Sequence, residues 1–421
     1  MTEPAAPMGH GAGALVARMI LMAGAAAACL SGCACERPRR APRMGADVPL
    51  VRVKLGSDAP SVAVAVLGPW RLTGAEGEIA SGKGLDWTPV TVSGGNVVVG
   101  RIATVNGPAE LSGADGGPVQ VSQWAGGKAR RCSYRGTLRL SPTGEGAVRL
   151  VNILPMEAYL AGVLANELLK SWHVEAYKAQ CIAARTYALM ERNARRRYDF
   201  DVYDSTLSQV YRGVGTETDT AWDAVEATWG VVATCRSADG KRALFKTYYH
   251  STCGGDTVPA GSVFGGSTPA PLVGGTGCTY CRESPKFRWP AVVLTKRDVS
   301  DALQRSGSAS LTPLGAVSRV EVAARTGTGG RAERIRIADT AGKSVLLRAG
   351  YWRTLVGAAK VPSTWFDVED RGDRIALTGG RGYGHGVGLC QWGAEYLAAH
   401  GKTGEEILRY YYPKVELVRV Y

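Results

Sequence analysis

A carboxylic acid in apolar surroundings, Glu167, is the residue of this sequence best suited to proton transfer. Its neighbours in the chain include Leu164, Leu168 and Trp172. Such neighbours remove water from a carboxyl group and favour its protonated form, which can donate a proton at neutral pH. An ionisable side chain in surroundings too apolar for an ordinary solvated surface indicates a functional site. Asp204 is a second carboxylate, and opposite Glu167 it would permit conventional two-carboxylate glycoside hydrolysis.

A glycine-rich block at 382–394, GYGHGVGLCQWGA, carries the next group of polar side chains. Glycine lets the backbone approach a ligand closely, and the polar side chains of the block are His385 and Gln391. Gln209 and Tyr211 form a similar polar and aromatic pair suited to sugar contacts. A hydrogen-bonding role inside the fold is the alternative for His385 and Gln391.

Two helices are expected to position Glu167. Pro155 fits the first turn of a short helix, and a second helix should begin near 171–173 and continue past 189. The second helix is apolar nearly all round, which predicts that it is buried. It nevertheless carries Lys178 and Arg185, and a buried cation needs a partner. Glu167, in the break between the two helices, is the candidate partner. A structural ion pair and a ligand-binding role are equally compatible with this pattern.

The sequence has ten cysteines, and the spacing of three of them and one histidine indicates a metal site. His250 and Cys253 are separated by two residues, as are Cys278 and Cys281. Two such pairs joined by a loop are typical of tetrahedral zinc, which predicts a structural zinc ion. Disulfides are one alternative if the protein is exported. In another, His250 lines a binding cleft, and the three cysteines bind zinc with a fourth ligand from outside this set. Two further cysteines in apolar or glycine-rich segments are expected to be packed free thiols: Cys181 and Cys390.

The N-terminus is typical of an exported lipoprotein. Residues 1–33 resemble a lipoprotein signal peptide, because a short apolar stretch at 19–30 ends in Leu30-Ser-Gly-Cys33. Cys33 would then be the lipidated first residue of the mature chain, facing the periplasm or cell wall; an ordinary secretory signal is the alternative. Residues 34–49, rich in proline and arginine, are expected to form a tether to the membrane.

The remaining chain predicts an α+β fold. Residues 50–134 alternate short apolar runs with glycine-rich breaks, which indicates a β-rich region. Residues 135–421 combine the central helices, forming a cleft, with further strands, the glycine-rich block and a last helix at about 391–399. The net charge is +13. An exported protein meets little nucleic acid, so we expect no nucleic-acid partner. The positive field would instead attract an acidic ligand, and the alternative is a general surface charge.

Six blocks in a fixed order resemble the stage II sporulation protein D family, which includes amidase enhancers. They are Pro155-Met-Glu-Ala-Tyr-Leu, Asn166-Glu167, Lys178-Ala-Gln-Cys-Ile-Ala-Ala-Arg-Thr-Tyr187, Ser208-Gln-Val-Tyr211, Tyr249-His-Ser-Thr-Cys-Gly-Gly255 and Gly384-His-Gly-Val-Gly-Leu-Cys-Gln-Trp-Gly-Ala394. The resemblance covers roughly 135–421. It departs from the family at the usual Pro-Ser-Glu-Met block, which here reads Leu164-Ala-Asn-Glu-Leu168.

The resemblance implies a lytic transglycosylase that cleaves peptidoglycan glycan strands stripped of stem peptides, with Glu167 as the catalytic acid. It also implies a set of substrate-binding residues: Lys178, Gln180, Arg185, Gln209, Tyr211, His250, Ser251, His385 and Gln391. Two alternatives remain. One is a non-catalytic module that binds glycan and recruits a cell-wall amidase. The other is a zinc-dependent hydrolase, which a complete four-ligand site disfavours because it leaves no open position for water.

Overall fold

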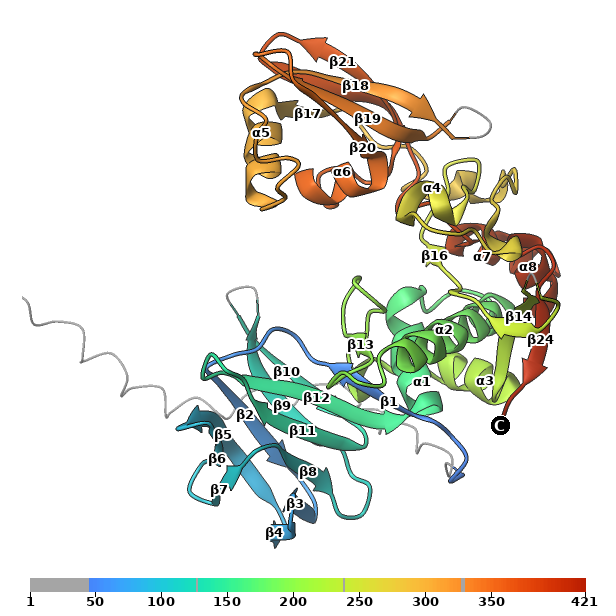
Figure 1. Ribbon diagram of the computed structural model, residues 1–421. Coiled ribbons are helices and arrows are strands. Elements are labelled where there is room, and N and C mark those ends of the chain that lie inside the picture. The colour runs from blue at the N-terminus through green and yellow to red at the C-terminus, as the bar shows by residue number, and fades with distance from the viewer. Residues whose placement is uncertain (1–44, 126–127, 238, 327–329) are drawn as a thin grey trace, which may run out of the picture. The chain divides into compact units, whose positions relative to one another are not determined.

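The computed structural model describes residues 45–125, 128–237, 239–326 and 330–421, all within one compact unit, Arg39–Tyr421. The predicted signal peptide, Cys33 and residues 34–44 of the tether lie outside the described residues. Helices and strands are mixed along the chain, which confirms the α+β prediction (Figure 1). Within the described ranges, no helix is long and apolar enough to cross a membrane.

Two sheets of mainly antiparallel strands pack face to face in the N-terminal part (Figure 1). The first has the order β13 (Val202–Tyr203), β1 (Leu50–Lys54), β12 (Val148–Pro155), β11 (Thr137–Pro142), β8 (Ala109–Gly113), β3 (Trp70–Gly74), β4 (Gly77–Gly82). The second has the order β10 (Lys128–Tyr134), β9 (Val119–Ala125), β2 (Ser61–Val66), β5 (Leu85–Ser93), β6 (Asn96–Val99), β7 (Ala103–Asn106). Alternate residues of these strands are buried, as in β1, where Val51 and Val53 face the core.

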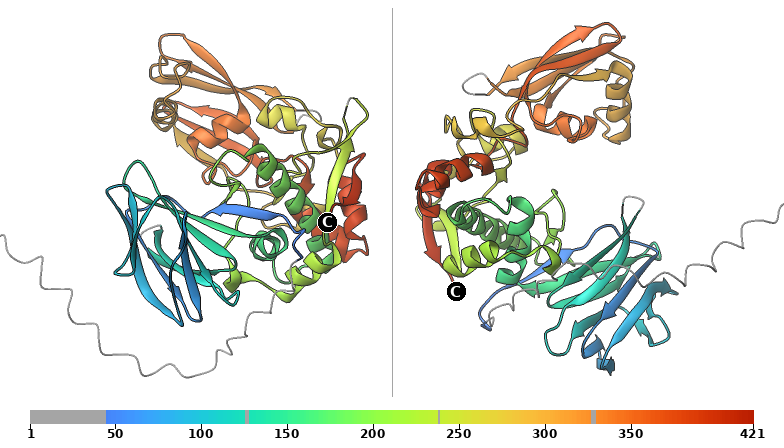
Figure 2. Two further views of the ribbon diagram at one scale, coloured as in Figure 1. Left: turned by 60° about the horizontal axis from the view of Figure 1, so that its bottom comes forward. Right: turned by 180° about the vertical axis from the view of Figure 1, so that it is seen from behind.

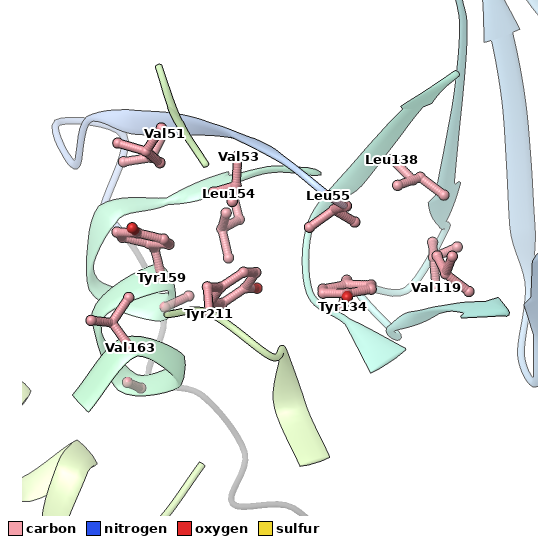
Figure 3. Close-up of a cluster of buried hydrophobic side chains, with 14 of the residues drawn as sticks. Val51, Val53, Leu55, Val119, Tyr134, Leu138, Leu154, Tyr159, Val163 and Tyr211 are labelled. Carbon is pink, nitrogen blue, oxygen red and sulfur yellow. The ribbon is translucent and has the colours of Figure 1, made fainter. Parts of the chain in front are cut away.

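The first sheet crosses the boundary expected at residues 134 and 135. In β1, Val51 pairs with Leu154 of β12, and β1 also pairs in parallel with β13. Strands from both predicted regions therefore share one sheet. The core beneath it includes the ring of Tyr211, which lies next to that of Tyr159 (Figure 3).

The central helices lie close to where the sequence places them. Helix α1 (Met156–Glu167) follows Pro155, and α2 (Val174–Ala194) is buried on nearly every side along Ala176–Leu189. Helices α3 (Asp219–Ala227), α7 (Gln391–Ala399) and α8 (Gly404–Tyr411) pack against α2 (Figure 2). The prediction of a last helix at 391–399 is confirmed by α7, whereas α3 and α8 were not predicted.

The remaining elements connect these helices with a second core. A small sheet contains β15 (Arg242–Leu244), β14 (Val231–Arg236) and β24 (Glu416–Arg419), and β16 (Tyr249–His250) pairs in parallel with β23 (Leu389–Cys390). Between β16 and β23 the chain forms two three-stranded sheets and short helices. These are α4 (Ala260–Phe264), η2 (Ala270–Leu272), η3 (Tyr280–Glu283), β17 (Val292–Thr295), α5 (Lys296–Arg305), β18 (Val317–Arg325), β19 (Ala332–Asp339), β20 (Ser344–Arg348), α6 (Ala349–Val356), β21 (Trp365–Arg371) and β22 (Arg374–Arg381).

Candidate functional site

Glu167 is the point at which three distant segments of the chain meet. It is the last residue of α1 and is partly exposed. The backbone N–H of Val210 donates to its Oε1 at 2.8 Å. The side-chain amide of Gln391, the first residue of α7, lies 3.4 Å from its Oε2. The carboxyl group is therefore oriented through both oxygens while it remains accessible from solvent.

Burial raises the pKa of Glu167 above its usual value of 4.5. The hydrogen bonds from Val210 and Gln391 and the positive charge of Arg212 lower the pKa, but they do not cancel the loss of hydration. Leu164, Leu168 and Trp172, the apolar neighbours in the sequence, are all buried or nearly so. These surroundings favour a carboxyl group that carries a proton further toward neutral pH than an exposed one does.

Asp204, the second carboxylate considered in the sequence, is buried and forms an ion pair with Arg212. Nη1 of Arg212 lies 3.4 Å from its Oδ2 and donates to its backbone carbonyl at 2.6 Å. Arg212 therefore connects the carboxylate of Asp204 to the segment that holds Glu167. This ion pair and the bond to the carbonyl orient the loop.

Gln209 holds the loop that carries Val210. Its side chain is fully buried; it donates to the carbonyl of Ala184 and to the hydroxyl of Tyr249, and accepts from the hydroxyl of Tyr159 at 2.9 Å. The expected sugar contact is thus replaced by three hydrogen bonds within the protein. A primary amide has few polar positions to spare after three bonds, so Gln209 positions the loop.

Tyr211 has the same structural role. Its hydroxyl donates to Oδ1 of Asn152 at 3.0 Å, and its ring packs between those of Tyr134 and Tyr159, as Figure 3 shows. A Cβ on Gly162 would lie 2.6 Å from this ring, so α1 needs a glycine there. Tyr211 is 2% exposed, which corrects the expectation that it contacts substrate.

The two histidines lie side by side, with ring centroids 5.3 Å apart. His250 donates from Nδ1 to the carbonyl of Val387 at 3.1 Å, and His385 accepts at Nδ1 from the N–H of Val387 at 3.0 Å. Burial, followed by the charge of Arg331, lowers the pKa of His250 to about 3. Nε2 of His250 is buried without a partner among the described residues, and Ser251 beside it is partly exposed. His250 is therefore neutral at physiological pH.

Two other predicted binding residues lie on α2. Lys178 is partly exposed and pairs with Glu175 at 2.6 Å, one turn away. Gln180 is fully buried, and neither its Nε2 nor its Oε1 has a hydrogen-bond partner within the described part of the chain. A buried amide with no partner is costly, so Gln180 lowers the stability of the fold.

Arg185 is a structural cation, which corrects the expectation that it faces substrate. Its Nε and Nη2 bond the two carboxylate oxygens of Glu157 at 2.8 and 2.7 Å, and both side chains are 0% exposed. Nη1 also donates to the carbonyl of Val231 at 3.0 Å. The partner comes from α1, 28 residues earlier, because the two helices pack together there.

The cysteine cluster differs from the expected ligand set in one member. Sγ atoms of Cys253, Cys278, Cys281 and Cys390 all lie within 4.8 Å of one another, and all four residues are buried. His250 is outside this group, because its ring packs on that of His385 instead. Cys390 was expected to be a packed free thiol, but the parallel pairing of β16 with β23 brings it beside the other three.

Three contributors to the site were missed in the sequence. Cys390 is more than a hundred residues from its partners, although its position directly before Gln391 in a glycine-rich block was a usable signal. Glu157 was overlooked as the partner of Arg185, although an acid in the first turn of a helix that is otherwise apolar was also a signal. The Val210 N–H is a backbone group, and no residue type reveals it.

Family models match two parts of the chain. A family model described as stage II sporulation protein matches residues 144–235, which include Glu167, Val210 and the whole of α2. A second model, described as a domain of unknown function, matches residues 279–388. That range covers most of the segment between β16 and β23.

Several curated proteins are similar over most of the chain. An uncharacterized protein of Brachyspira hyodysenteriae is 33% identical over 68% of this chain and 72% of its own length. The stage II sporulation protein D of Bacillus subtilis is 28% identical over 67% of this chain and 80% of its own length. The amidase enhancer of Bacillus subtilis is 28% identical over 61% of this chain but only 40% of its own length.

Proposed function

Because the chain belongs to the stage II sporulation protein D family, we propose that it acts on the bacterial cell wall as a lytic transglycosylase. The substrate is a peptidoglycan glycan strand without stem peptides, and the product is a 1,6-anhydro-muramic end. The observation that supports this most is the single carboxyl group of Glu167, oriented through both oxygens and with a raised pKa.

One carboxyl group suffices for this reaction. Glu167 donates its proton to the glycosidic oxygen as the bond to the muramic anomeric carbon breaks. The resulting carboxylate then removes the proton from the 6-hydroxyl of the same sugar, whose oxygen attacks the anomeric carbon. The proton count balances, since Glu167 ends protonated, and no water is consumed. The N–H of Val210 and the amide of Gln391 stabilise the carboxylate between the two steps.

A binding role is the second candidate, and the name of the amidase enhancer relative favours it. In that role the protein holds glycan and assists a cell-wall amidase. The two candidates separate in one experiment with the purified protein and denuded glycan strands. The transglycosylase releases soluble saccharides by itself. A binder releases none from denuded strands, and instead accelerates the release of stem peptides by an added amidase from peptide-bearing peptidoglycan.

A structural zinc ion completes the proposal. Four thiolates bind zinc tetrahedrally with Zn–S distances of about 2.3 Å, so their sulfur atoms lie within roughly 4 Å of one another. The cluster of Cys253, Cys278, Cys281 and Cys390 has that donor set, with all four sulfur atoms within 4.8 Å of one another and 3.3 Å between those of Cys253 and Cys281. Bound there, the ion would stabilise the junction of β16 with the start of α7, where Gln391 contacts Glu167.

Cys390→Ser should lower both the zinc content and the melting temperature. A filled structural site adds its binding free energy to folding, so losing one ligand removes part of that stability. Elemental analysis and thermal unfolding measure the two effects. Cys235→Ser is the matched control, since Cys235 is buried outside the cluster and should leave zinc content unchanged. A metal-free parent protein would contradict the assignment.

We also propose that lipid on Cys33 anchors the protein to the membrane on its outer side. Cys33→Ser should move the protein from the membrane fraction to the soluble fraction without unfolding it, because the acyl chains supply the attachment. Fractionation followed by a salt wash measures this. A variant that still sediments with membranes after the wash would show that Cys33 is not the anchor.

A further inference from the structure

A cavity of about 540 Å³ opens on the second N-terminal sheet. It lies beside the loop whose Val210 N–H donates to Glu167. Its wall includes residues from β5, β9, β10 and the segment at 212–216: Trp87, Gln120, Arg130, Arg131, Arg212 and Thr216. Most of these residues precede the range matched by the family model. The size is that of sites for small molecules or single sugar units.

Two contacts connect this cavity to the catalytic carboxyl group. Arg212 lines the cavity, and its charge acts on Glu167. Thr216 also lines it, and its hydroxyl accepts from the side-chain amide of Asn166, the residue directly before Glu167, at 2.8 Å. A Cβ on Gly213 would lie 2.1 Å from the carbonyl oxygen of Ser133, so this loop packs directly on β10. The cavity is therefore a neighbour of the acid.

The wall of the cavity is strongly basic. Three arginines line it, and none of the residues that line it is acidic. Nη2 of Arg130 is buried and has no hydrogen-bond partner among the described residues. The guanidinium of Arg131 lies over the ring of Trp87, 4.9 Å from its centroid, and Trp87 is 38% exposed. A guanidinium nitrogen without a partner is costly, and an anionic ligand would satisfy it.

We propose that this cavity is a subsite for an acidic sugar unit of the glycan strand. The carboxylate of the sugar pairs with Arg130 and Arg131, and the apolar face of the sugar ring packs near Trp87. A muramic unit without its stem peptide carries such a carboxylate on its lactyl group. The inference rests on the proposed function, because the sugar belongs to the same strand that reaches Glu167. It also assigns carboxylate binding to residues other than Lys178 and the buried Arg185.

Binding of two glycan probes to the Glu167→Gln protein tests this subsite. One probe is the denuded strand with its lactyl carboxylates, and the other is the same strand after chemical reduction of those carboxylates to alcohols. The protein should bind the carboxylate strand more tightly. Arg131→Gln should weaken binding of that strand about tenfold or more and change binding of the reduced strand little, since a charge-assisted bond is lost.

Arg71→Gln is the matched control, because Arg71 is an exposed arginine of β3 that pairs with Glu78 outside the cavity. It should leave both affinities unchanged. Equal weakening of both strands by Arg131→Gln, or no weakening of either, would overturn the subsite. These affinities are measured without cleavage, so the subsite can be confirmed even if the wild-type protein does not cleave glycan. Cleavage by the wild-type protein can likewise be confirmed even if Arg131→Gln shows that the subsite is wrong.

Discussion

Glu167→Gln should abolish glycan cleavage while leaving glycan binding nearly intact. The amide keeps the shape of the carboxyl group and can still accept from the N–H of Val210, but it has no proton to transfer. A general acid or base contributes about 10²–10⁴-fold to a rate, and one group performs both roles here. Release of soluble saccharides from denuded strands measures the loss. Rates within tenfold of the parent protein would contradict the assignment.

The stability of the same variant provides the control for folding. Burial raises the pKa of Glu167, so between its usual value of 4.5 and its native value the folded protein binds more protons than the unfolded chain. This group therefore lowers stability as pH rises through that window. Glu167→Gln should be no less stable than the parent at pH 7, and its relative advantage should shrink toward pH 4. Denaturant unfolding at the two pH values measures the difference.

Arg185→Met should destabilise the protein by about 3–5 kcal/mol, because it leaves the carboxylate of Glu157 buried without its cation. Domains typically have only about 5–15 kcal/mol of stability, so we expect a large loss of folded protein at 37 °C. Glu157 would retain the hydroxyl of Tyr421, which donates to its Oε1 at 2.6 Å. The N–H of Gly230 would also remain, 3.3 Å from the same oxygen, but two neutral hydrogen bonds do not replace a bidentate ion pair. Chemical denaturation measures the change.

The double variant Arg185→Met/Glu157→Met distinguishes a structural ion pair from a substrate-binding arginine. Removing both charges leaves no buried ion, and apolar replacement of such pairs is often nearly neutral. The double variant should therefore regain most of the stability lost in Arg185→Met, and cleavage should return with it. If stability returned but cleavage did not, Arg185 would have a direct role in the reaction.

The sequence predicted the elements of this fold better than their contacts. The helix containing Lys178 and Arg185 followed from its periodicity, and α7 was placed at the same residues that the structure shows. The acid at Glu167 followed from the resemblance of its block to the family, and its apolar neighbours predicted a raised pKa. Each of these signals is local, since it depends only on residues within a few turns of the chain.

The errors all concern which distant residues meet. The partner of Arg185 lies on another helix, so burial predicted that a partner exists but not that it is Glu157. Gln209 and Tyr211 have side chains suited to sugars, and only the structure shows that hydrogen bonds inside the fold use them. Cys390 joins the other cysteines through pairing of β16 with β23, across more than a hundred intervening residues. No spacing rule in the sequence reports such pairing.

The chemical nature of the new chain ends tests the central claim most directly. Denuded glycan strands digested by the purified protein should yield fragments that end in 1,6-anhydro-muramic acid, which mass spectrometry distinguishes from a hydrolytic end by the mass of one water molecule. Because Glu167 uses the 6-hydroxyl of the sugar in place of water, we expect anhydro ends alone, and none with Glu167→Gln. Reducing ends would indicate hydrolysis and would contradict the one-carboxyl mechanism. Intact strands would show that the protein binds glycan without cleaving it.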